Sequence, residues 1–139
     1  SAASDVYKRQ VLEAAAGSDV QLYVSTFYQE GGSPEFDDGI KAWLNEDSTA
    51  MTNNGGNDTI AAVTAMGYDA YYVALEALKA AGSTDPAAVK AALPGVTYTG
   101  VTGDIAFDDI GDAIRDTAYI KVADTANSAW ALETMQKAG

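Results

Sequence analysis

The chain of 139 residues contains no cysteine and no histidine. This excludes zinc sites built on either residue, cysteine nucleophiles, Ser-His-Asp catalysis and haem ligation by histidine. The absence of cysteine is compatible with an exported protein but does not establish export.

Basic residues are also scarce, because eight lysines and arginines stand against 20 aspartates and glutamates, for a formal net charge of −12. The acidic residues are spread along the chain without a long run. This balance argues against nucleic acid or an anionic membrane surface as a partner. No apolar run approaches the roughly 18 residues of a membrane span, and no signal peptide opens the chain, so we expect an exported precursor's leader to be missing from it.

The most informative stretch, Met66 to Asp112, begins inside a predicted long helix. Asp58 is the expected N-cap of this helix, and Gly82 lies just past its end. Its polar residues fall at helical spacing on one narrow stripe, and these are Asp69, Tyr72, Glu76 and Lys79. A surface helix needs only about 100° of apolar face, so we expect this one to be covered over most of its circumference.

A short helix and several strands are predicted after Gly82. Asp85 is placed to cap a helix that starts at Pro86 and ends at Leu93, before Pro94-Gly95. Apolar residues then recur with a period of two, which predicts strands. The alternating residues are Val96 and Tyr98, then Ile105 and Phe107, then Ala118, Ile120 and Val122. Turns are expected at Gly100, Gly103 and residues 108–112.

The first half of the chain has less regular signals. Pro34 opens a predicted helix with four apolar residues on one face, namely Phe36, Ile40, Trp43 and Leu44. Residues 47–57 are polar and include Asn-Asn-Gly-Gly, so we predict a mobile loop there.

Two blocks of sequence carry a family resemblance, GYDAYYVALEALKAAGSTDPAAVKAAL followed by YTGVTGDIAFDDIGDAIRD. Together they resemble the C-terminal third of type I periplasmic solute-binding proteins, and most of all the branched-chain amino-acid receptors of ABC transporters. The earlier segment DVQLYVSTFY is similar to the family's strand that enters a crossing between the lobes, so the resemblance spans about Asp19 to Val122. It implies an α/β fold that forms the C-terminal portion of a two-lobed type I periplasmic-binding fold and is incomplete on its own.

The same resemblance implies a domain boundary near residue 17. Residues 1–17 are expected to be a leader outside the family pattern, and residues 18–139 to be the C-terminal segment, mostly first-lobe helices and return strands. Residues 1–10, SAASDVYKRQ, resemble translated sequencing-adapter text. We therefore expect them not to be native.

The candidate ligand site also comes from the resemblance. In the family, the crossing loop and the loop that opens the GYDA helix line the cleft between the lobes. The matching ligand-binding positions are Thr26, Phe27, Tyr28, Val63 and Thr64. An apolar wall with one or two hydroxyl groups suits an amino-acid side chain. For Tyr28 and Val63, simple packing stays open as an alternative.

No catalytic, metal or cofactor site is predicted. The carboxylates of the expected hairpin do not follow the spacing of a calcium loop, and they are Asp104, Asp108, Asp109, Asp112 and Asp116. The glycines match neither a P-loop nor a dinucleotide-binding fingerprint. A solvated hairpin end accounts for the carboxylates.

The function that the resemblance implies is that of the substrate-binding component of an ABC transporter. Such a protein captures a small polar solute by hinge closure and presents it to a membrane permease. A branched-chain or related amino acid is the expected solute, and the periplasm or the cell exterior, including a surface lipoprotein, the expected location. Two alternatives stay open, a ligand-binding domain of a sensory receptor or regulator, and a fragment that binds nothing and associates through exposed apolar surface. The missing histidine and cysteine disfavour an enzyme.

Overall fold

The computed structural model describes residues 10–137. The chain divides into two compact units; within the described residues, the first comprises residues 10–63 and 118–136 and the second residues 64–117 and Lys137. Each unit is associated with a three-stranded sheet and with helices. No helix in the described residues is long and apolar enough to cross a membrane.

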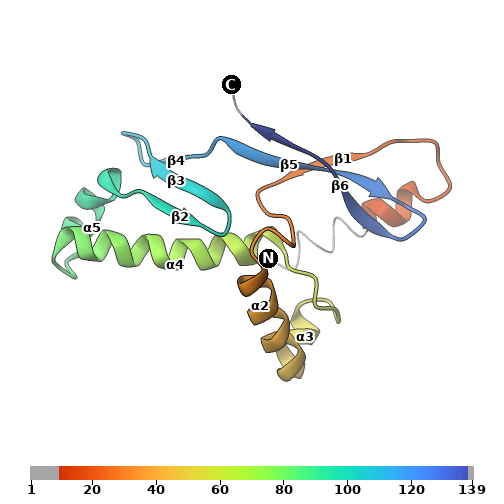
Figure 1. Cartoon of the computed structure of the whole chain (residues 1–139), viewed down its shortest axis with the longest axis horizontal. Helices are drawn as coiled ribbons and strands as arrows, with labels where there is room; N and C mark the ends of the chain where they lie inside the picture. Colours follow the sequence, from red (N-terminus) through yellow and green to blue (C-terminus); the bar gives the residue numbers. More distant parts are fainter. Residues whose placement is uncertain (1–9, 138–139) are drawn as a thin grey trace. The chain divides into compact units, whose positions relative to one another are not determined.

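The sheet of the first unit has the strand order β1-β5-β6 (Figure 1). Its strands are β1 (Tyr23–Thr26), β5 (Thr117–Asp124) and β6 (Ala129–Lys137). Strand β1 runs antiparallel to β5, with Tyr23 opposite Val122 and Thr26 opposite Tyr119. The strands expected from DVQLYVSTFY and from the alternation through Val122 are therefore confirmed. Strand β6 was not predicted, and nearly all its residues are exposed.

Two consecutive helices belong to the first unit, α2 (Pro34–Glu46) and α3 (Ser48–Asn53). Helix α2 starts at Pro34 as predicted and buries Phe36 and Leu44. Trp43 was expected on the same apolar face but is 54% exposed. The predicted loop over residues 47–57 is wrong where α3 forms. Helix α3 forms there because the carboxylate of Asp47 accepts hydrogen bonds from the N–H groups of its first turn.

The second unit is built around α4 (Ala62–Ala81). The prediction that this helix starts after Asp58 is wrong, since α4 begins at Ala62. In the segment before it, the N–H of Thr59 donates to the Asn57 side chain and that of Ile60 to Glu30. The helix ends before Gly82, as predicted, and Gly82 adopts φ +57°. The buried residues of α4 recur at every fourth position, and they are Ala65, Asp69, Val73 and Ala77.

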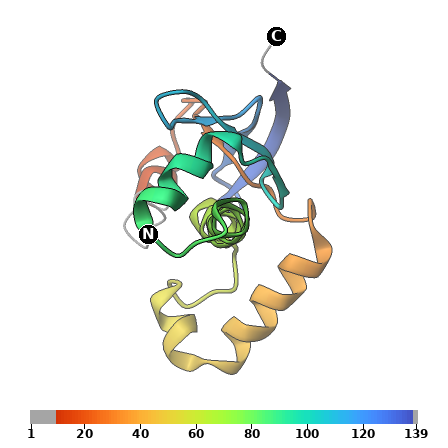
Figure 2. The same ribbon diagram turned by 90° about the vertical axis from the view of Figure 1, so that its left-hand side faces the viewer.

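The remaining elements of the second unit are α5 (Pro86–Ala92), the 3₁₀ turn η1 (Leu93–Gly95), β2 (Tyr98–Gly100), β3 (Gly103–Phe107) and β4 (Ala113–Ile114). Residues of α5, η1, β2 and β3 pack with the buried face of α4, whereas both residues of β4 are exposed. Figure 2, which looks along α4, shows α5 and the β2–β3 hairpin on the same side of it. The core joins Val73 and Ala77 to Val96 and Ile105. Asp85 caps α5 as predicted, with the N–H of Ala88 3.1 Å from its carboxylate.

Most of the circumference of α4 is not covered by the described residues. Tyr71 is 62% exposed, and Ala70 and Ala74 are exposed as well. The expectation of an almost fully covered helix is therefore met on one face only.

Asp69 joins α4 to the β2–β3 hairpin through a fully buried carboxylate. It accepts the backbone N–H groups of Val101 and Thr102, each at 2.8 Å, and the Thr102 hydroxyl at 2.5 Å. Arg115 donates to the same hydroxyl at 2.8 Å. Asp69 was expected on a polar stripe of the helix, but it is instead the acceptor that fixes the turn of the hairpin.

Candidate functional site

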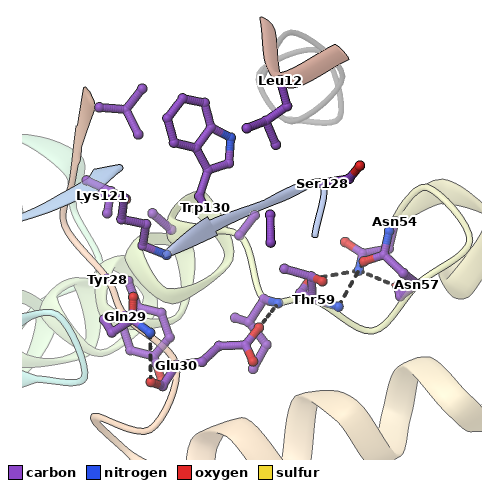
Figure 3. Close-up of a pocket in the computed structure, with 16 residues that line it drawn as sticks. Leu12, Tyr28, Gln29, Glu30, Asn54, Asn57, Thr59, Lys121, Ser128 and Trp130 are labelled. Carbon is purple, nitrogen blue, oxygen red and sulfur yellow. Dashed lines mark hydrogen bonds between the residues drawn. The ribbon is translucent and has the colours of Figure 1, made fainter. Parts of the chain in front are cut away.

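A cavity of about 380 Å³ lies within the first unit (Figure 3). Strand β1 contributes Thr26, and the segment after β1 contributes Tyr28 through Glu30. The loop before α4 supplies residues such as Asn54 and Ile60, and β6 supplies Trp130. The cavity thus gathers side chains from segments more than 70 residues apart.

Two of the five predicted site residues line this cavity. Thr26 is 7% exposed and Tyr28 is 3% exposed. The residue between them, Phe27, is 39% exposed and does not line the cavity, because alternate residues of an extended segment face opposite sides. Val63 is 44% exposed and does not line it either, and Thr64 belongs to the second unit. A ligand role for all five residues stays a prediction.

Tyr28 is held in place by Asp37 near the start of α2. The Tyr28 hydroxyl donates to one oxygen of this buried carboxylate, and the N–H of Gly31 donates to the other at 2.7 Å. The ring of Phe36 meets that of Tyr28 edge to face, with centroids 5.5 Å apart. Burial, followed by the hydrogen bond to Asp37, raises the pKa of Tyr28. Tyr28 is therefore protonated at neutral pH, and its side chain is held in place in the cavity wall.

Glu30 ties the segment after β1 to two other parts of the unit. One carboxylate oxygen lies 2.9 Å from Nζ of Lys41 on α2, and the other accepts the N–H of Ile60 at 2.6 Å. The hydrogen bond with Glu30 raises the pKa of Lys41. The negative charge of Glu30 is thus balanced by the ammonium group of Lys41.

The polar loop before α4 is ordered by its own side chains. The Asn54 amide donates to the carbonyl of Asn57 at 2.8 Å and to that of Thr59 at 3.0 Å. The Asn57 side chain accepts the N–H of Thr59 at 3.0 Å. Asn54, Asn57 and Thr59 line one wall of the cavity, and these hydrogen bonds hold that wall in place.

Two buried side-chain atoms within residues 10–137 have no hydrogen-bond partner, and both belong to residues of this cavity. They are Oε1 of Gln29, an acceptor, and Nε1 of Trp130, a donor. In Figure 3, Trp130 lies beside Leu12, and Gln29 lies beside Tyr28 and Glu30.

Sequence reasoning missed several residues of the cavity. Gln29 and Glu30 directly follow the predicted Tyr28, so extending the site along the same segment would have found them. Trp130 lies beyond the stretch that carries the family resemblance, and no sequence signal pointed to it.

The described residues contain no group of three or more acidic side chains arranged to hold a metal ion. The carboxylate of Asp108 closes its own turn instead, accepting the N–H groups of Ile110 at 3.0 Å and Asp112 at 2.8 Å. The cavity also lacks a nucleophile paired with a base among these residues.

The comparison with protein families decides the class of this chain. A family model described as "Periplasmic binding protein" matches residues 1–127. The chain belongs to the periplasmic binding protein family. Residues 1–9 of the suspected adapter text lie outside the described residues, and the domain boundary at residue 17 stays a prediction.

A solved structure resembles this periplasmic binding protein chain in fold. The chain is similar to the leucine-binding protein LivK from Thermotoga maritima MSB8, with a TM-score of 0.64 and 24% sequence identity. The match covers 93% of this chain and 34% of LivK, so the chain spans about a third of that protein. The α/β fold predicted as part of a type I periplasmic-binding fold is therefore confirmed. No curated protein matches the chain.

Proposed function

We propose that this chain contributes a solute-binding surface to the substrate-binding component of an ABC transporter. The observation that carries the proposal is the cavity of about 380 Å³, whose walls combine aliphatic side chains with a few fixed polar groups. This is the usual character of a small-molecule site. Family membership supports the same class of function.

The proposed solute is an amino acid, with L-leucine as the first probe. An aliphatic side chain finds apolar contacts at Leu12, Val24 and Ile60. Thr26 and Tyr28 add hydroxyl groups to the same wall. The name of LivK, a leucine-binding protein, makes leucine the natural starting point.

The proposal extends to the partner, the location and the fate of the solute. A type I receptor closes about its hinge on the solute and passes it unchanged to a membrane permease. The protein would act in the periplasm or at the cell surface. No bond of the solute is made or broken, in keeping with the lack of an assembled nucleophile and base in the described part of the cavity.

Thermal unfolding of the 139-residue chain with an amino-acid panel tests this proposal. L-leucine, L-valine, L-glutamate and L-lysine are compared at equal concentration and pH. A bound solute stabilises the folded state by RT ln(1 + [L]/Kd), which is about 2.7 kcal/mol at a hundredfold excess over Kd. We expect the melting temperature to rise with concentration for L-leucine and L-valine. If it rises for none of the four amino acids, the proposed solute class is wrong.

A further inference from the structure

Lys121 is the only positively charged side chain among the described residues that line the cavity of the first unit. Lysines are usually exposed, whereas this one is partly buried on β5. The chain has eight basic residues against 20 acidic ones, so few cations are available to it for binding a solute. A lysine in a cavity wall therefore bears on the charge of the group that the cavity can bind.

The register of the sheet places Lys121 on the cavity side. On β1, Val24 and Thr26 line the cavity, and Ser25 between them is exposed. Lys121 lies directly opposite Val24 in the antiparallel pair of β1 and β5, so the two side chains point to the same face of the sheet. Thr26 is its diagonal neighbour on that face, within reach of a long side chain. In Figure 3 the side chain of Lys121 extends into the cavity on the side of Tyr28.

Glu30 is the only acidic side chain among the described residues of the same wall, and both of its oxygens are engaged by the protein. One lies 2.9 Å from Nζ of Lys41, and the other accepts the N–H of Ile60 at 2.6 Å. Lys121 differs in capacity, because an ammonium group has three N–H donors and can bind a solute in addition to a contact with the protein.

The other polar side chains of the wall are uncharged. The hydroxyl groups of Thr26, Thr59 and Ser128 can each donate or accept a hydrogen bond, so they fit a solute group of either sign. The side chains of Asn54 and Asn57 bond within their own loop. These groups do not select the charge of the solute group, which leaves that selection to the charged side chains.

We propose that the ammonium group of Lys121 binds the carboxylate of the solute, an inference that rests on the function proposed above. Hydrogen bonds between an ammonium group and a carboxylate are charge-assisted and stronger than those between neutral groups. The carboxylate has a second oxygen, which can accept a hydrogen bond from the neighbouring Thr26 hydroxyl. The cavity therefore takes an amino acid with a free carboxylate and discriminates against the amide of the same amino acid.

A comparison of L-leucine with L-leucinamide tests the contact, because the amide keeps the side chain and the amino group but lacks the negative charge. In isothermal titration calorimetry, we expect the unchanged chain to bind L-leucine about tenfold or more tightly than L-leucinamide. In Lys121→Met this preference should disappear, because the affinity for L-leucine falls and that for L-leucinamide does not. Lys121→Arg keeps the positive charge and should keep the preference.

The matched control is Lys90→Met, the same substitution at an exposed lysine on α5 in the second unit. We expect this variant to prefer L-leucine as strongly as the unchanged chain does. If the unchanged chain binds L-leucine but binds L-leucinamide equally well, or if Lys121→Met keeps the preference or loses both ligands alike, the carboxylate contact is wrong and the proposed function stands. If the unchanged chain binds none of the four amino acids of the panel, the proposed function fails, and the inference fails with it.

Discussion

At the scale of single residues, the contact between Gly100 and Asp69 shows how closely the second unit is packed. A Cβ atom placed on Gly100 would lie 2.3 Å from Cγ of Asp69. Real Cβ atoms essentially never lie within 3.0 Å of an unbonded heavy atom, and the neighbour is a fully buried carboxylate with three hydrogen bonds. Glycine is required at position 100 because the carboxylate occupies the space of a side chain.

The substitution Gly100→Ala should therefore destabilise the second unit strongly. The added methyl group displaces Asp69 and breaks its bonds to the hairpin turn, so we expect the free energy of unfolding to fall by about 2 kcal/mol or more. Urea denaturation followed by circular dichroism measures the change. The control is Gly95→Ala, where a new Cβ meets no atom within 4 Å. Equal stability of the two variants would contradict this role of Asp69.

Residue-scale features were only partly predictable from the sequence. The cap at Asp85 and the helix end at Gly82 were predicted correctly because each depends on neighbours within a few residues. The burial of Asp69 was missed because its partners, Val101 and Thr102, lie 32 and 33 residues away. Helical spacing alone cannot separate a buried carboxylate from a solvated one.

At the scale of elements, α3 links the helical part of the first unit to the candidate site. Asp47 caps this helix with bonds of 2.8 Å to the N–H of Thr49 and 3.0 Å to that of Ala50. The helix passes directly into the loop at Asn54, which lines the cavity. The cap therefore supports one wall of the site.

Asp47→Ala should weaken both the helix and the binding of L-leucine. Loss of an N-cap costs about 1 kcal/mol of helix stability, and amide exchange over residues 48–57 should accelerate. The matched control is Asp85→Ala, which removes the cap of α5 in the second unit. We expect a similar cost in stability from the control but unchanged affinity for L-leucine. An equal loss of affinity in both variants would show that α3 does not support the site.

Elements with strong local signals were the ones that could be predicted. Helices α2, α4 and α5 and the strands through Val122 followed from spacing, proline and glycine positions. Helix α3 was not predicted, because the polar Asn-Asn-Gly-Gly segment at its C-terminal end favours a loop. Strand β6 was missed because most of its residues are exposed, so apolar alternation does not mark it. With β6 unpredicted, Trp130 was not considered for the site.

At the scale of the whole molecule, the family resemblance predicted what periodicity could not. The apolar surface of α4 is only partly covered by the described residues, and the chain matches 34% of the length of LivK. Both observations agree with a chain that represents part of a type I periplasmic-binding fold. The resemblance predicted that Thr26 and Tyr28 line a ligand cleft; both line the cavity of the first unit, and their ligand role stays a prediction.

The most direct test of the account is a titration of the ¹⁵N-labelled chain with L-leucine, followed by NMR. We predict that the amide signals of residues 26–30, 54–62 and 128–130 shift together with the indole N–H signal of Trp130. One dissociation constant should describe all of these changes. Signals that do not move at high L-leucine concentration, or changes confined to residues 64–117, would contradict a solute site in the first unit.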